Sequence, residues 1–381
     1  TSGQFFRQNR PAEIIGDTRR ERAKQERDKS MPTADSEPCF PYGTNKSVSK
    51  DSCVCLEGWN GDTCSVPQVV WEDPVFRSLH SQGLIKRRLI PRTIISSFMF
   101  NHEMDLLDIR IHVLGDSVDY YVVCESSYTN FGSPKPLYLS SNLSAGFLSE
   151  HRHKIILLTS ETNYGKYKDP WAPENNIRSL LWQQGRHRFK NLRDDDLFMI
   201  GDADEIPSRE VMLFLKYHDG YGEPIAFGLR WFLYGFFWEN DRPVIVTSVC
   251  TVGYLRDVYG DDSNLVRKNE RRHVIQPTRT NTGTVWTPWT IKGVSPKYAG
   301  WHCSWCFSIS GIQLKLASSQ RDDGIRWADF AEKHDPEYIR FLRREGRYFD
   351  ESPPLRKADG YRAAPAYVVQ EEKRWPYLLN V

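Results

Sequence analysis

The sequence lacks several features that would assign it to a specialised class of protein. No run of apolar residues reaches the roughly 18 positions that a membrane-spanning helix needs, and there is no internal repeat. No excess of one charge sign is present either, because 51 Lys and Arg residues face 49 Asp and Glu residues, which leaves a net charge of +2. Such a balance gives no general footprint for nucleic acid. With 39% hydrophobic and 13% aromatic residues over 381 positions, the composition is that of a globular chain with a large core.

Cysteine is scarce as well, but four of the eight residues stand close together near the start of the chain. The stretch CVCLEGWNGDTC has the spacing C-x-C-x8-C and follows a single earlier cysteine. A zinc site of four thiolates would need closely spaced pairs at both ends, which this stretch lacks. It resembles the C-terminal half of an EGF-like module, and that resemblance implies the disulfides Cys39–Cys53 and Cys55–Cys64. Disulfides in turn indicate an oxidising compartment.

Two further features bear on the compartment. The N-x-S tripeptides at Asn45 and Asn142 are candidate glycosylation sites, which occur on secretory proteins. The remaining four cysteines include a C-x-x-C pair, which indicates redox chemistry in a cytosolic protein but favours structural disulfides in an oxidising compartment. The expected disulfides join this pair to the two cysteines elsewhere, although the sequence selects none of the three possible pairings. The four residues are Cys124, Cys250, Cys303 and Cys306.

The order of charged and apolar stretches divides the chain into three parts. Residues 1–37 are charged and poor in apolar side chains, which predicts a solvated stem. The EGF-like piece occupies residues 38–66, and strand and helix patterns alternate from 67 to 381. This alternation predicts a sheet of mostly parallel strands with helices on both faces. The strands are expected at 92–100, 119–126, 153–160 and 196–202, and the helices at 104–115, 173–192 and 207–220.

An acidic turn follows the last of these strands. The stretch FMIGDADEIPSRE places Asp202, Asp204 and Glu205 after an apolar run, where like charges raise each other's pKa unless a positive group lies between them. Pro207 suits the first position of the next helix, whose N-terminus attracts one carboxylate such as Glu205. That attraction does not explain the D-x-D pair. At the carboxyl end of a strand in an α/β sheet, where ligands bind, this pair favours a nucleotide-sugar transferase of the GT-A kind.

Three stretches together carry a family resemblance. FNHEMDLLDIR at 100–110, GDADEIPSRE at 201–210 and AGWHCSWCF at 299–307 are similar, in content and order, to glycosyltransferase family 17. The resemblance implies a GT-A-like α/β fold, with a single Rossmann-type mixed sheet and helices on both faces. It also implies Mn2+ as cofactor and an inverting, β1,4 transfer of GlcNAc from UDP-GlcNAc to the core β-mannose of N-glycans. It further implies a type II membrane protein of the Golgi lumen, whose membrane anchor is missing from this sequence.

Candidate donor and metal residues come from the same stretches. Asp204 is the first metal ligand to expect, with Asp202 on the metal or on the donor's ribose, because a divalent cation neutralises the charge developing on a leaving diphosphate. His302 is the candidate ligand from later in the chain, with a hydrogen-bonded core histidine as the alternative. Further donor-binding candidates are Asn101, Glu103, Asp105 and Arg178. The alternative role for Asp105 is helix capping, and the alternative for Arg178 is an ordinary exposed position on a helix.

Inversion also requires a carboxylate base within hydrogen-bond reach of the acceptor hydroxyl. Asp323 is the first candidate, followed by Asp262 and Glu205, although each is otherwise an ordinary loop acid. The aromatic run RWFLYGFFWEN offers a stacking platform for acceptor sugar rings, with a simple core role as the alternative. Its candidates are Trp231, Tyr234 and Trp238. Because all candidate reactive residues follow Arg92, the EGF-like piece is expected to be dispensable for chemistry.

Three other functions compete with this interpretation. A transferase of the same fold with a different glycan acceptor would keep every residue role given above. A non-catalytic extracellular glycan-binding protein explains the EGF-like piece and the aromatic residues, but not the D-x-D at a strand end. A metal-dependent phosphohydrolase would normally gather more His and Asp ligands than one turn and one histidine. Release of UDP that depends on the acceptor separates the transferase from the binding protein.

Overall fold

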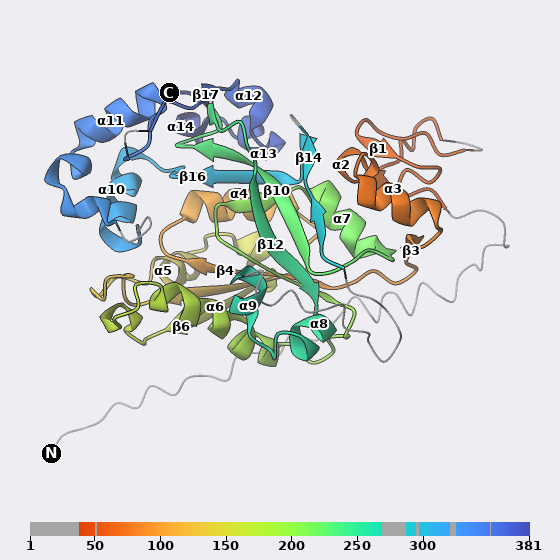
Figure 1. The fold of residues 1–381 in the computed structure, drawn as a ribbon, viewed down its shortest axis with the longest axis horizontal. Helices are drawn as coiled ribbons and strands as arrows, with labels where there is room; N and C mark the ends of the chain where they lie inside the picture. The colour runs from red at the N-terminus through yellow and green to blue at the C-terminus, as the bar shows by residue number, and fades with distance from the viewer. Residues whose placement is uncertain (1–37, 50–51, 269–286, 295–296, 321–324, 351) are drawn as a thin grey trace, which may run out of the picture.

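The computed structural model describes residues 38–49, 52–268, 287–294, 297–320, 325–350 and 352–381. The predicted stem at 1–37 lies outside the described residues, as does Asp323, the first candidate for the base. No helix within these ranges is long and apolar enough to cross a membrane. The described part of the chain is a mixed α/β fold around a curled central sheet (Figure 1).

Parallel strands form one half of the central sheet, and antiparallel strands follow. The main strands are β4 (Ile94–Phe100), β5 (Tyr120–Ser126), β6 (Ile155–Ser160), β7 (Leu197–Gly201), β10 (Ile225–Leu233) and β12 (Val244–Thr251). β7, β4, β5 and β6 lie side by side in that order and pair in parallel. β12 is antiparallel to β7, and β10 is antiparallel to β12. The four predicted strands and the mixed sheet are therefore confirmed.

Short strands extend the sheet from β10 toward the C-terminal part of the chain. They are β8 (Glu205–Pro207), β11 (Trp238–Glu239), β13 (Trp289–Ile291), β16 (Gly300–Ser304) and β17 (Arg356–Lys357). β16 pairs in parallel with β10 and antiparallel with β8, so His302 lies opposite Glu205. Three small pairs stand apart: β1 (Trp59–Asn60) with β2 (Val66–Pro67), β3 (Lys86–Arg87) with β9 (His218–Asp219), and β14 (Gly293–Val294) with β15 (Lys297–Tyr298).

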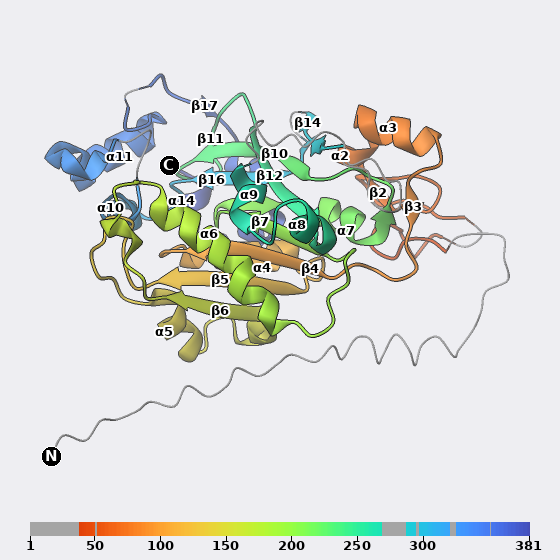
Figure 2. The same cartoon turned by 60° about the horizontal axis from the view of Figure 1, so that its bottom comes forward.

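Helices cover both faces of the sheet, as predicted (Figure 2). Successive strand residues point to opposite faces, so Ile94 packs in one core cluster and Ile95 in another. The first cluster includes residues of α4 (Met104–Leu114), α5 (Tyr138–Ser144) and α7 (Arg209–Tyr217). The second includes residues of α6 (Ala172–Gly185), α8 (Val252–Asp257) and α9 (Ser263–Lys268). α6 therefore ends earlier than the predicted helix at 173–192.

The helix after the acidic turn begins later than predicted. Pro207 does not open it, because this residue ends β8 and pairs with Gly300 of β16. Ser208 is the N-cap, and its hydroxyl accepts a hydrogen bond from the amide of Val211 at 3.3 Å. The turn that carries the acidic residues is consequently held between two strands rather than leading directly into a helix.

The EGF-like piece packs into the body of the protein. Both implied disulfides, Cys39–Cys53 and Cys55–Cys64, are present. Phe40 is fully buried, and its ring lies edge-on to the ring of Tyr217 in α7 at 5.2 Å. Val66 is part of the main core cluster. The short helices α2 (Gln68–Trp71) and α3 (Pro74–Ser81) follow directly (Figure 1). Residues 38–66 therefore share a core with the α/β part.

The C-terminal elements build a further core beside β16. They are α10 (Ile309–Ser318), α11 (Pro336–Glu345), α12 (Gly360–Ala363), α13 (Ala366–Gln370) and α14 (Pro376–Leu379). Cys303 and Cys306 are disulfide-bonded to each other within this core. The expected disulfides to the other two cysteines are wrong, because Cys124 and Cys250 are buried free thiols on β5 and β12.

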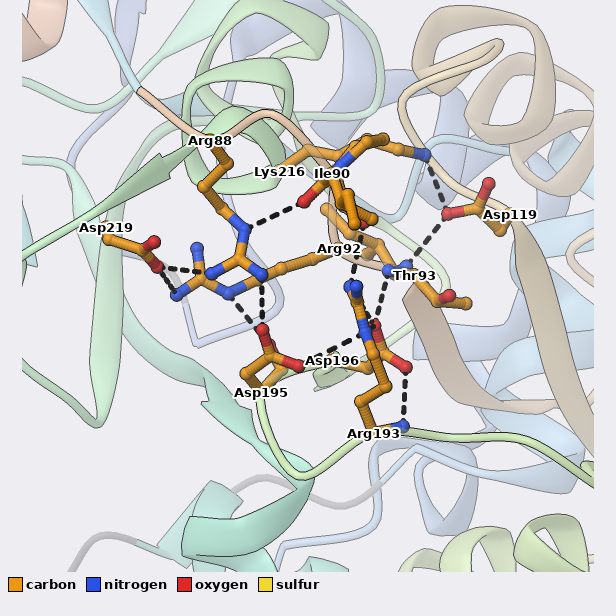
Figure 3. Close-up of polar contacts among 12 residues, drawn as sticks. Arg88, Ile90, Arg92, Thr93, Asp119, Arg193, Asp195, Asp196, Lys216 and Asp219 are labelled. Carbon is orange, nitrogen blue, oxygen red and sulfur yellow. Dashed lines mark hydrogen bonds and ion pairs between the residues drawn. The ribbon is translucent and has the colours of Figure 1, made fainter. Parts of the chain in front are cut away.

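A polar network ties together the amino ends of the parallel strands, on the edge opposite the acidic turn (Figure 3). Asp196 accepts hydrogen bonds at 2.8 Å from the amides of Thr93 and Arg193. Asp119 accepts from the amide of Ile94 at 2.9 Å and from the Lys216 ammonium at 2.6 Å. Arg88 and Arg92 join the network through Asp195 and Asp219. The network fixes the strand starts and leaves the carboxyl edge free to form a site.

Candidate active site

The acidic turn lies at the carboxyl edge of the parallel strands, where sequence analysis placed it. Asp202 follows β7 directly, and its amide donates to Glu205 Oε2 at 2.9 Å, while the Glu205 amide donates to the Asp202 carbonyl at 3.1 Å. A Cβ on Gly201 would lie 3.2 Å from Glu205 Oε2, so a glycine suits the close approach of this carboxylate. These reciprocal bonds give the turn one compact shape.

Three arginine side chains contact Asp202 and Glu205, through their carboxylates or their main-chain carbonyls. Arg178 donates to Asp202 Oδ1 at 2.9 Å, and Arg267 contacts both Asp202 Oδ2 at 3.1 Å and Glu205 Oε1. Arg110 is buried and donates to the carbonyl oxygens of Asp202, at 3.1 Å, and Glu205. Burial lowers the pKa of Arg110 to about 10, with the nearby acidic groups opposing that effect. The side chains of the protein itself therefore compensate the crowding of Asp202 and Glu205.

The three carboxylates of the turn differ in their electrostatics. Burial alone would raise the pKa of Asp202, but Arg178 and Arg267 outweigh it and hold the pKa well below its usual range. Burial likewise opposes ionisation of Glu205, whose pKa is lowered chiefly by Arg267. Burial raises the pKa of Asp204, which has only the Lys315 ammonium at 3.9 Å as an ion-pair partner among the described residues. Asp204 is thus the carboxylate that gains most from a further cation.

His302 lies behind the turn on β16. Its Nδ1 is buried, lies 3.7 Å from Glu205 Oε1, and has no hydrogen-bond partner within the described residues. Burial favours the neutral ring, but Asp204 and Glu205 outweigh it and raise the pKa of His302. The amide of Cys303 donates to the Asp204 carbonyl at 3.0 Å, so β16 also holds the middle of the turn. His302 therefore belongs to the acidic cluster and not to the aromatic core, and its role as a metal ligand stays a prediction.

Two cavities adjoin the turn. The smaller, of about 160 Å³, is lined by the ends of β4 and β5 and by the acidic turn after β7, together with Lys135 and Lys315. The larger, of about 800 Å³, is lined by α6, β12 and the end of α9. Glu174 and Arg178, one turn apart on α6, line both cavities. A charged cleft therefore runs from the carboxyl edge of the parallel strands past α6 to β12.

The structure brings four of the predicted donor residues to the smaller cavity, namely Asn101, Glu103, Arg178 and Asp202, and leaves Asp105 outside. Asn101 and Glu103 line it, but Asn101 donates to Ser318 Oγ at 2.7 Å, and Glu103 accepts from the Asn101 amide at 2.7 Å. Both side chains thus shape the turn after β4. Asp105 is exposed on α4 and does not line the cavity, because its carboxylate accepts a hydrogen bond from the Tyr377 hydroxyl at 2.6 Å.

The predicted acceptor platform is not a surface in the structure. Tyr234 is fully buried and Trp238 is buried, and their polar atoms donate to the carbonyls of Arg347, at 3.0 Å, and Arg343, at 2.7 Å. Trp231 is half-buried, and its indole donates to Ser304 Oγ at 3.0 Å. A core role, the stated alternative, fits the packing of Tyr234 and Trp238 in the cluster that includes the C-terminal elements.

Neither described candidate for the base lines a cavity at the turn. Glu205 is buried and paired with Arg267. Asp262 accepts hydrogen bonds from Ser179 Oγ at 2.7 Å and from the Asn264 amide at 3.0 Å, and it lines neither cavity at the turn.

Several site residues were missed by sequence reasoning. Arg267 is far from the turn in sequence and carried no motif. Glu174 did carry a local signal, since it precedes Arg178 by four residues on a predicted helix and pairs with it at 3.2 Å. The others are Arg110, Lys135 and Lys315.

Comparison with known proteins finds a family that matches the segment containing the acidic turn. The sequence model of glycosyltransferase family 17 matches residues 71–259, which include the acidic turn and both β4 and α6. Over this segment, about half of its length, the chain is similar to glycosyltransferase family 17.

Individual relatives extend the match beyond that segment. The chain is 42% identical to the β-1,4-mannosyl-glycoprotein 4-β-N-acetylglucosaminyltransferase of Homo sapiens over 337 residues. The matched region covers 86% of this chain and 62% of the relative. It is 41% identical over 337 residues to the protein of the same name from Rattus norvegicus, with 86% and 61% covered. The chain thus spans about three fifths of the length of these relatives.

Proposed function

We propose that this protein is an N-acetylglucosaminyltransferase that moves GlcNAc from UDP-GlcNAc, in β1,4 linkage, to the core β-mannose of N-glycans. The observation that carries the proposal is Asp204, a carboxylate with a raised pKa that lines a cavity at the carboxyl edge of parallel strands. The names of the relatives specify a mannosyl-glycoprotein acceptor and a GlcNAc product. The three disulfides agree with a secretory compartment, which we propose to be the Golgi lumen.

The two cavities suit the two substrates of a GT-A-like enzyme. In open α/β sheets, ligands bind outside the carboxyl ends of the strands, which is where the smaller cavity lies. Arg178, Lys135 and Lys315 line it and offer positive charge to a diphosphate. Its volume of about 160 Å³ is below that of a typical ligand site, so the donor extends toward the larger cavity. The larger cavity then receives the acceptor glycan.

Part of the predicted metal set fits a divalent cation. Among the described residues, no group of three or more His, Cys, Asp or Glu side chains is arranged to hold a metal ion. A cation that also binds substrate phosphates needs only one or two protein carboxylates. Asp204 fits this role, with the buried Nδ1 of His302 behind it, whereas Asp202 is committed to two arginines. When bound there, Mn2+ would neutralise charge developing on the leaving diphosphate.

The side chains have distinct tasks in the proposed reaction. The acceptor hydroxyl oxygen attacks C1 of the GlcNAc from the side opposite the diphosphate, so an α-linked donor gives a β-linked product. Arg178 and Lys315 stabilise the phosphate charge as the C1–O bond breaks. The buried pairs between Arg267 and the turn keep Asp202 and Glu205 ionised and fixed, which preorganises the loop that carries Asp204.

Release of UDP tests the proposal. The protein is incubated with UDP-GlcNAc and Mn2+, with and without a biantennary N-glycan. Release that requires the glycan supports a transferase. Donor consumption without the glycan indicates a hydrolase, and no release under either condition indicates a glycan-binding protein. UDP-galactose in place of UDP-GlcNAc is the matched control for the donor.

A further inference from the structure

The reaction proposed above needs a group that accepts the proton of the acceptor hydroxyl. Such a group must line the cleft between donor and acceptor. Of the three acids expected from the sequence, Glu205 and Asp262 line neither cavity, and Asp323 lies outside the described residues.

Glu174 meets the geometric requirement. It lies in the first turn of α6 and lines both the cavity at the acidic turn and the larger cavity. Arg178 Nη2 lies 3.2 Å from Glu174 Oε2 and 2.9 Å from Asp202 Oδ1, so one guanidinium joins this carboxylate to the acidic turn. The Glu174 side chain is 22% exposed and thus accessible from the cleft.

We propose, on the basis of the function proposed above, that Glu174 is the proton acceptor of the transfer reaction. The acceptor O–H bond breaks and its proton moves to a Glu174 carboxylate oxygen, while the hydroxyl oxygen forms the new bond to C1. The C1–O bond to the diphosphate breaks, and its electron pair leaves with UDP. No oxidant or further reactant is required, and the carboxylate is regenerated when the proton passes to solvent.

The surroundings of Glu174 suit this role. Burial raises the pKa of Glu174, with Asp202 acting in the same direction, whereas Arg178, Arg267 and Lys315 oppose the rise. A carboxylate with a raised pKa is a stronger base than an ordinary exposed one. Its pairing with Arg178 fixes the rotamer without removing both oxygens from the cleft.

The test uses the isosteric change Glu174→Gln, which preserves an oxygen that accepts a hydrogen bond from Arg178 but removes the basic group. We expect turnover at saturating substrates to fall by about 100-fold or more, while calorimetry finds UDP-GlcNAc affinity within about threefold of the wild type. The acid limb of the pH profile for turnover should disappear. Glu174→Asp should recover part of the turnover.

Glu337→Gln is the matched control, because Glu337 also lies in the first turn of a helix and pairs with an arginine, but outside the cleft. It should leave turnover unchanged. Near-normal turnover of Glu174→Gln beside an active wild type would overturn the assignment of Glu174 alone. If the wild type transfers no GlcNAc to the glycan, the proposed function fails, and the role of Glu174 fails with it.

Discussion

Protonation of His218 should weaken the attachment of the EGF-like piece to the body of the protein. The His218 ring is buried and stacks on Phe214 at a centroid distance of 4.4 Å. Its Nδ1 lies 3.0 Å from the Phe214 carbonyl and its Nε2 lies 3.1 Å from Ser65 Oγ, a partner set that suits a neutral ring with the proton on Nδ1. Burial lowers the pKa of His218 to about 4, and the neighbouring Arg87 and Arg92 add to the effect.

The direction of the pH dependence follows from the pKa of His218 in the folded and unfolded states. The unfolded chain binds this proton at a pKa of about 6.5 and the folded chain at about 4, so the free energy of unfolding falls as pH drops through this window. Integrated from about pH 7.5 to about pH 5, the loss is about 2 kcal/mol. Other histidines titrate in the same range, so the contribution of His218 is obtained from the difference between the wild type and a His218 variant.

Urea unfolding at these two pH values measures the effect. The wild type should lose about 2 kcal/mol more than His218→Gln between them, because glutamine cannot be protonated. His153→Gln, at an exposed position, is the control and should behave as the wild type. Equal pH dependence for the wild type and His218→Gln would refute the reasoning.

Three further changes probe the core and the site. Phe40→Ala should lower the free energy of unfolding by about 3 kcal/mol or more in urea titration, because Phe40 is fully buried against Tyr217; a loss below about 1 kcal/mol would mean that residues 38–66 are only loosely attached. Arg267→Leu should lower the free energy of unfolding by about 3 kcal/mol in the same assay, because it leaves the buried Glu205 carboxylate without its cation. An unchanged urea midpoint would contradict that pairing. Asp204→Asn should abolish both transfer and the Mn2+-enhanced affinity for UDP-GlcNAc in calorimetry, with an unchanged melting temperature; equal donor affinity with and without Mn2+ in the wild type would exclude a metal at this turn.

The parallel half of the fold was readable from the sequence because each buried strand is a run of mostly apolar residues. The runs at 94–100 and 197–201 needed no long-range information, and the carboxylates after the second one had to fall at the carboxyl edge. The start of α7 was misplaced, because Pro207 suits both a first helical turn and a strand end, and only the pairing with β16 decides between them.

The surroundings of the acidic turn could not be predicted, because they depend on contacts between distant segments. Nothing local marks Arg267 as the partner of Glu205, and Asp105 was assigned to the donor although it faces Tyr377. Aromatic residues are ambiguous for a related reason: the same side chains serve as core or as a sugar platform, and only burial separates Tyr234 from an exposed ring. The EGF-like spacing predicted its two disulfides but not the core it shares with α7.

The central claim is that Asp204 and the cleft beside it serve GlcNAc transfer to the core mannose of N-glycans. The most direct test is NMR of the product formed from UDP-GlcNAc, Mn2+ and a biantennary N-glycan. The account predicts one new GlcNAc in β linkage on O4 of the core β-mannose, formed by the wild type and absent with Asp204→Asn. An α-linked product, a different acceptor position, or equal product from Asp204→Asn would contradict it.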